Sequence, residues 1–175
     1  MKRIILITGG QRSGKSAYAE QLALSLDAHP IYMATAHIWD EEFRLRVIQH
    51  QRRRGGQWEN IEEERQLSKH CIYNKVCVID CLTLWYTNFF YDDGKNTAEE
   101  IDVQDVLHDL KDEFDRFTQQ EATFIFVTNE IGSGGVSDHL LQRKFTDLEG
   151  WMNQYVAQRA DEVILMVAGI PVKIK

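Results

Sequence analysis

An octapeptide of glycine, serine and basic residues constrains this chain more than any other feature. Residues Gly9–Ser16 read GGQRSGKS, which matches the pattern G-x-x-x-x-G-K-[ST]. The apolar run Ile4–Ile7 before it predicts a buried strand, and the amphipathic run Lys15–Leu26 after it predicts a helix. A strand, a glycine-rich turn and a helix in this order form a phosphate-binding loop, or P-loop. The sequence therefore predicts a nucleoside triphosphate site.

The residue types of this loop suit phosphate binding. Glycines let backbone amides turn toward phosphate oxygens, and the helix N-terminus adds a partial positive charge. Lys15 is expected to reach the β- and γ-phosphates as a catalytic residue, and the Ser16 hydroxyl is expected to bind Mg²⁺. The nucleotide-binding residues predicted in the loop are Gly9, Gly10, Gln11, Arg12, Ser13, Gly14, Lys15 and Ser16.

Asp80 ends a second apolar run, Val76–Ile79. A carboxylate at the end of such a strand can bind Mg²⁺ through water or hold Ser16 in place. The alternative is an ordinary N-cap of the helix expected over Leu82–Phe90. We predict a metal site of Ser16 and Asp80 that holds Mg²⁺ together with GTP or ATP.

Short apolar runs alternate with longer amphipathic runs along the whole chain, which is typical of an α/β fold with a mostly parallel sheet. The short connection Gly169–Pro171 between the last two runs predicts a C-terminal antiparallel hairpin. The length of 175 residues fits one domain over residues 1–175. Further strands are expected over 31–34, 123–127, 163–167 and 172–174, and further helices over 40–53, 101–117 and 140–156.

Composition narrows the class of protein. The formal charge of −7 argues against a broad nucleic-acid surface, which needs basic residues. The run Ile4–Ile7 is too short for a secretion signal, and no stretch reaches the ~20 apolar residues of a membrane span. The three cysteines, Cys71, Cys77 and Cys81, lack zinc-site spacing and are expected to be reduced thiols. These observations predict a soluble, cytoplasmic protein.

A basic cluster in an otherwise acidic chain is the remaining chemical signal. Arg46, His50 and Arg54 recur every fourth residue and share one helix face. Neighbouring guanidinium groups lower the pKa of an imidazole, and the neutral ring is a nucleophile that can attack an α-phosphate and expel pyrophosphate. A charged, solvated helix face with an incidental histidine explains the same residues. The residues alone also leave open another small-molecule kinase, or a regulatory module that binds a nucleotide without group transfer.

Several motifs follow one another in a recognisable order. They are ITGGQRSGKS at 7–16, Asp40, Glu42, Arg46 and His50, DCLTLW at 80–85, TNEIG at 128–132 and GIPVKIK at 169–175. In this order they resemble the bifunctional adenosylcobinamide kinase/adenosylcobinamide-phosphate guanylyltransferases over nearly the whole chain. The chain departs from the family pattern at Gly55, Asn60 and Thr146, where the family has proline, threonine and arginine.

The resemblance implies a RecA-like, three-layer P-loop fold, a homotrimer and two reactions. The first phosphorylates adenosylcobinamide with ATP or GTP. The second passes GMP from GTP, through a covalent GMP–histidine, to adenosylcobinamide phosphate and yields adenosylcobinamide-GDP. His50 occupies the guanylylated position. The implied nucleotide contacts beyond the loop are Thr35, Ala36, His37, Gln51, Arg52, Arg53, Arg54, Glu62 and Asp80.

Overall fold

A computed structural model describes residues 1–37, 55–91, 97 and 99–175. Among these residues seven strands form one sheet in the order β3-β2-β4-β5-β1-β6-β7. All neighbouring strands are parallel except the last pair, β6 and β7, which is antiparallel. The strands are β1 (Arg3–Thr8), β2 (Ile31–Ala34), β3 (Glu59–Glu62), β4 (Val76–Asp80), β5 (Thr123–Val127), β6 (Glu162–Val167) and β7 (Ile170–Lys173).

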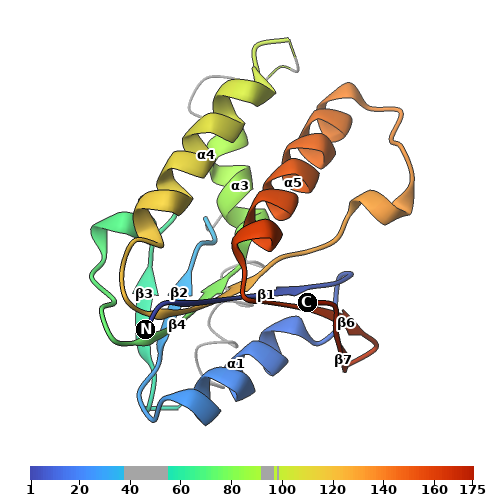
Figure 1. The fold of residues 1–175 in the computed structure, drawn as a ribbon. Helices are drawn as coiled ribbons and strands as arrows, with labels where there is room; N and C mark the ends of the chain where they lie inside the picture. The colour runs from blue at the N-terminus through green and yellow to red at the C-terminus, as the bar shows by residue number, and fades with distance from the viewer. Residues whose placement is uncertain (38–54, 92–96, 98) are drawn as a thin grey trace.

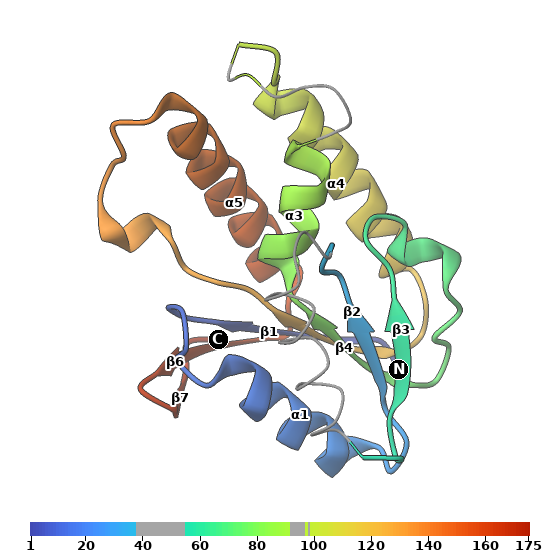
Figure 2. The same cartoon turned by 180° about the vertical axis from the view of Figure 1, so that it is seen from behind.

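Helices cover both faces of this sheet. Helix α1 lies on one face, and α3, α4 and α5 lie together on the other (Figure 1), an arrangement that is equally clear from behind (Figure 2). The mostly parallel three-layer fold and the C-terminal hairpin predicted from the sequence are thereby confirmed. The helices are α1 (Lys15–Leu26), α3 (Leu82–Phe90), α4 (Val103–Phe117) and α5 (Leu140–Arg159), with short 3₁₀ turns η1 (Leu67–Lys69) and η2 (Gly132–Gly134).

The core divides at the sheet because successive side chains of a strand point to opposite faces. In β1, Ile4 and Leu6 belong to the core under α3, α4 and α5, whereas Ile5 and Ile7 pack on the α1 side. Covering both faces buries every residue of the run Ile4–Ile7, which is why the strand reads as continuously apolar. The two apolar layers keep the parallel strands aligned, so that their carboxyl ends lie along one edge of the sheet.

Several elements differ from the sequence prediction. Strand β3 was not predicted, because its residues ENIE carry no apolar alternation and it lies at the edge of the sheet beside β2 alone. Strand β7 begins at Ile170 rather than Val172, and α5 continues to Arg159 rather than ending at Val156. The helix expected over 40–53 and the loop expected over 92–96 lie outside the described residues.

Two large aromatic residues of α3 belong to the core. Trp85 is fully buried and its indole N–H donates to the carbonyl oxygen of Arg65, while Phe90 is 1% exposed and packs edge-on against Phe145. The cysteines Cys77 and Cys81 are buried free thiols. In the described parts of the chain, no helix is both long and apolar enough to cross a membrane.

Candidate nucleotide site

The P-loop connects β1 to α1 at the carboxyl edge of the sheet, and two of its glycines are required by geometry. Gly9 has a φ of +148°, and a Cβ atom there would lie 2.5 Å from the carbonyl oxygen of Met166 in β6. Gly14 has a φ of +94° and is the N-cap of α1. Side chains other than hydrogen are strained at such φ angles. The loop therefore packs tightly against β6 and the β6–β7 turn.

Lys15 is the first residue of α1 and is only 7% exposed. Its amino group donates a hydrogen bond of 2.7 Å to the carbonyl oxygen of Gly10 within the loop. Burial lowers the pKa of Lys15, while the nearby Cys81, Asp80 and Glu149 act in the opposite direction. A desolvated ammonium that donates to a neutral carbonyl gains strongly from a phosphate oxygen. This geometry suits the role predicted for Lys15.

Other side chains of the loop differ in their exposure. Gln11 and Arg12 are exposed, whereas Ser16 is partly buried in the first turn of α1. The Ser13 hydroxyl is buried and makes no hydrogen bond within the described residues, although the Ser13 carbonyl oxygen accepts from the Gly169 amide at 3.0 Å. A buried hydroxyl without a partner is uncommon in native folds. A phosphate oxygen in the loop would supply that partner.

Asp80 lies at the carboxyl end of β4, close enough to Lys15 to affect its pKa. One carboxylate oxygen of Asp80 accepts a hydrogen bond of 2.7 Å from the Tyr32 hydroxyl. The N-cap of α3 is Cys81 and not Asp80, so the alternative of a helix cap is wrong. A serine hydroxyl and an aspartate carboxylate supply the hard oxygen ligands that Mg²⁺ prefers.

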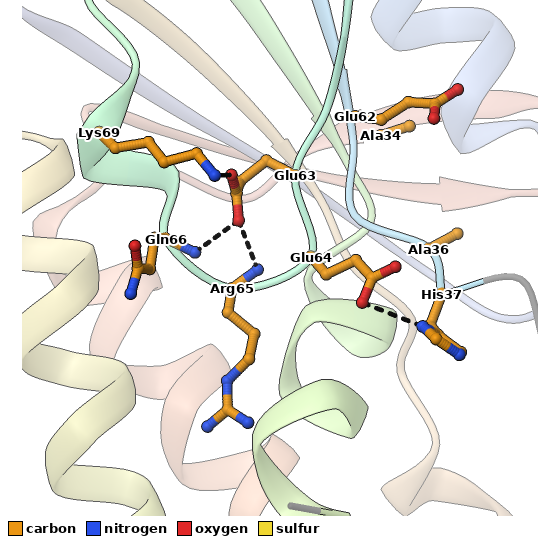
Figure 3. A pocket seen from close by; sticks show the side chains of 9 residues that line it. All are labelled: Ala34, Ala36, His37, Glu62, Glu63, Glu64, Arg65, Gln66 and Lys69. Carbon is orange, nitrogen blue, oxygen red and sulfur yellow. Dashed lines mark hydrogen bonds and ion pairs between the residues drawn. The ribbon is translucent and has the colours of Figure 1, made fainter.

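A second group of predicted nucleotide residues meets at the carboxyl ends of β2 and β3. Ala36, His37 and Glu62 line a pocket of ≈ 620 Å³ (Figure 3). Thr35 does not line it, because its hydroxyl donates to the carbonyl oxygen of Cys81 at 2.7 Å and the residue is fully buried. The Thr35 side chain therefore joins β2 to β4, while its two neighbours face the pocket.

The acidic residues after β3 play different parts in this pocket. Figure 3 shows Glu64 reaching toward His37, with 3.0 Å between Oε2 and Nδ1, and Glu63 turned toward Lys69. Burial tends to raise the pKa of Glu63, but Lys69, two backbone amides and His70 together lower it to about 2. Glu63 thus fixes the wall of the pocket as an anion at neutral pH.

The remaining predicted residues cannot be placed. Gln51, Arg52, Arg53, Arg54 and the proposed nucleophile His50 lie outside the described residues. The P-loop follows β1 and the pocket follows β2, and two strands, β5 and β4, separate them in the sheet. Three strand spacings correspond to ~14 Å. The described site therefore consists of two parts on the same edge, with Asp80 between them.

One buried acid near the P-loop was missed by sequence reasoning. Glu149 of α5 is 1% exposed, accepts a hydrogen bond of 2.6 Å from the Thr83 hydroxyl, and lies near Lys15. The available signal was its position, four residues after Phe145 and three before Met152, which places it on the inward face of α5. An acid on an apolar helix face is a marked exception to normal burial.

Comparison with known proteins adds to this geometry. The family described as cobinamide kinase / cobinamide phosphate guanyltransferase matches residues 5–174. The bifunctional adenosylcobalamin biosynthesis protein CobU of Escherichia coli is 36% identical over 98% of this chain and 99% of its own. CobU of Salmonella typhimurium is 37% identical over 98% of this chain and 99% of its own, and CobP of Pseudomonas aeruginosa is 34% identical over 97% and 96%.

A solved structure supports the fold alone. An ATPase from the type III secretion system of pathogenic bacteria aligns with 98% of this chain and 56% of its own, with a TM-score of 0.58 and 13% identity. Such low identity carries no information about substrate. The family match spans nearly the whole chain, including the P-loop, Asp80 and the C-terminal hairpin. The chain therefore belongs to the cobinamide kinase / cobinamide phosphate guanyltransferase family.

Proposed function

We propose that this enzyme catalyses two successive reactions on adenosylcobinamide. In the first, the γ-phosphoryl group of ATP or GTP passes to the aminopropanol hydroxyl, and a nucleoside diphosphate and a proton are released. In the second, His50 attacks the α-phosphate of GTP and expels pyrophosphate. The phosphate of adenosylcobinamide phosphate then displaces the histidine and yields adenosylcobinamide-GDP. The observation that carries this proposal is the match to the family over residues 5–174.

The geometry of the P-loop supports the phosphate-binding part of the proposal. Lys15 is desolvated and its neutral partner, the Gly10 carbonyl, is readily exchanged for a phosphate oxygen. Electrostatic stabilisation of the transferred group is the main task of a P-loop enzyme, because positioning and charge dominate phosphoryl transfer. Ser16 and Asp80 would hold Mg²⁺, which neutralises phosphate charge when bound.

The pocket at the ends of β2 and β3 supports a second nucleotide contact region. Ala36, His37 and Glu62 line it, and Glu63, which is charged at neutral pH, fixes its wall. A carboxylate such as Glu62 can accept hydrogen bonds from amino and imino groups, which a guanine base offers. We assign these three residues and Asp80 to the binding of the nucleotide, together with residues 51–54.

The covalent step rests on the family resemblance, in which His50 occupies the guanylylated position, and on the sequence spacing of Arg46, His50 and Arg54. Side chains four residues apart share a helix face, and flanking guanidinium groups keep an imidazole neutral and nucleophilic. We retain the homotrimer as part of the proposal, with an interface that excludes the buried Trp85 and Phe90. The proposal also assigns the enzyme to the cytoplasm, where nucleoside triphosphates are available.

Product analysis tests the two reactions. The enzyme is incubated with adenosylcobinamide, GTP and Mg²⁺, and the corrinoids are separated by chromatography and identified by mass spectrometry. We expect adenosylcobinamide phosphate first and adenosylcobinamide-GDP later, with one pyrophosphate for each GMP transferred. Lys15→Ala should lose the phosphorylated product, whereas the exposed Lys2→Ala should retain it. Unchanged adenosylcobinamide with the folded wild-type enzyme would refute the assignment.

A further inference from the structure

Glu149 occupies the buried end of a directed chain of hydrogen bonds. The Thr83 hydroxyl donates to Glu149 Oε1 at 2.6 Å, and the Asn129 amide N–H donates to the Thr83 oxygen at 3.0 Å. A hydroxyl has one proton to donate, so the Thr83 proton points at Glu149 Oε1. Glu149 Oε1 is therefore the acceptor at the end of this chain. The second oxygen, Oε2, is buried and has no hydrogen-bond partner within the described residues.

The segment after β5, residues Thr128–Glu130, is held from both sides. Asn153, one turn beyond Glu149 in α5, donates to the Asn129 carbonyl oxygen at 3.1 Å and accepts from the Thr128 hydroxyl at 2.8 Å. On the other side, the Glu130 amide N–H donates to the Gly9 carbonyl oxygen at 3.0 Å. The position of the first P-loop glycine is thus coupled to α5 through this segment.

The charges around Glu149 come from several elements. Lys15 of the P-loop and Glu130 after β5 act on it directly, and Cys81 and Tyr86 of the β4–α3 region lie within electrostatic reach. Burial raises the pKa of Glu149 to about 7, Glu130 adds to this effect, and Thr83 and Lys15 oppose it. Burial also raises the pKa of Cys81 to about 12 and that of Tyr86 well above its ordinary value, so both stay neutral near pH 7.

We propose that Glu149 is a positioning residue of the nucleotide site: its Oε1 holds Thr83 and the Asn129 segment against the P-loop, and the charge of its anion weakens nucleotide binding. The inference rests on the proposed nucleotide site at Gly9–Ser16. A triphosphate places several negative charges beside Lys15, and an ionised Glu149 repels them and competes for the same ammonium group. Nucleotide binding therefore favours the protonated acid, and the unpartnered Oε2 carries the proton.

The pH dependence of nucleotide affinity tests this proposal. The probe is the α,β-methylene analogue of GTP with Mg²⁺, which cannot transfer GMP, and its Kd is measured by calorimetry between about pH 6 and about pH 8.5. Glu149→Gln is the matched variant, because its amide keeps the acceptor for Thr83 and stays neutral at every pH. Titration of the ligand phosphates is common to both proteins and cancels in the comparison. The effect of Glu149 on the pKa of Lys15 is part of the difference that the two proteins report.

We expect the affinity of the wild type to fall up to ~10-fold more than that of Glu149→Gln as the pH rises, the ceiling for a pKa shift of one unit on binding. The wild type should also take up protons on binding near pH 7, which calorimetry in two buffers of different ionisation enthalpy detects. Equal pH slopes for the two proteins would overturn the proposal.

A second pair of variants tests the hydrogen-bond chain without touching the acid. Thr83→Val removes the hydroxyl at nearly constant volume, and Thr83→Ser retains it. At about pH 6, loss of the chain should weaken binding ~3- to 10-fold in the valine variant and leave the serine variant near the wild type. Equal affinities of both variants would overturn the positioning role. If the wild type binds no analogue at any pH, the proposed nucleotide site itself fails.

Discussion

Replacement of Gly9 by alanine should destabilise the folded chain by about 4 kcal/mol, the sum of a strained backbone and an overpacked contact of about 2 kcal/mol each. The new Cβ atom would lie 2.5 Å from the Met166 carbonyl oxygen and 2.9 Å from Ser13 Oγ, at a φ of +148°. The first contact is with backbone of β6, which cannot rotate away. Either β6 or the P-loop must then shift.

Gly10→Ala is the matched control, because a Cβ atom there meets nothing within 4 Å. Urea unfolding followed by tryptophan fluorescence measures both variants against the wild type, since Trp58 and Trp85 are buried. Gly10→Ala should stay within about 0.5 kcal/mol of the wild type, the usual range for exposed substitutions. A difference between the two variants below about 1 kcal/mol would show that the P-loop does not pack against β6 as described.

Three further predictions concern stability. The pKa of Glu149 is raised from 4.5 to about 7 in the folded state. The free energy of unfolding of the wild type should therefore fall by about 3 kcal/mol relative to that of Glu149→Gln as the pH rises from about 5 to about 8. Parallel pH curves of the two proteins in urea unfolding would contradict this. The pKa of Glu63 is lowered to about 2, so the stabilisation by its charge is complete above pH 4.5 and is lost as the pH falls. Glu63→Gln should lower the free energy of unfolding by about 2 kcal/mol at pH 7 and by almost nothing near pH 2. The exposed Lys69 should contribute little of this difference. Asp102 caps α4 by accepting from the Gln104 amide at 2.8 Å, and Asp102→Ala should lower the unfolding free energy by about 1 kcal/mol, whereas no change would rule out the cap.

Much of the fold could be predicted because its signals are local. The runs Ile4–Ile7 and Phe124–Val127 are buried on both faces and read as continuous apolar runs, and the P-loop glycines mark the turn between β1 and α1. Strand β3 gave no such signal, since three of its four residues are polar and it pairs with β2 alone at the sheet edge. An edge strand of this kind is defined by its neighbour rather than by its own sequence.

The site residues could be predicted only where a known sequence motif indicates their chemical role. Lys15 and Asp80 lie near one another as expected from their positions after two parallel strands. Glu149 was missed because the analysis of α5 counted apolar residues, and a single acid on that face signals nothing until Thr83 and Lys15 are seen beside it. Thr35 was expected to contact the nucleotide, and the structure shows that its hydroxyl donates to the Cys81 carbonyl oxygen. The sequence gives no sign of this internal hydrogen bond.

The central claim is that a histidine of this chain carries GMP during catalysis. The most direct measurement is intact-protein and peptide mass spectrometry after incubation with GTP and Mg²⁺, without corrinoid, for the wild type and His50→Ala. The account predicts that the wild type gains the mass of one GMP unit on the peptide containing His50, with release of pyrophosphate, and that the variant gains none. No added mass on the wild type, or equal labelling of the variant, would contradict it.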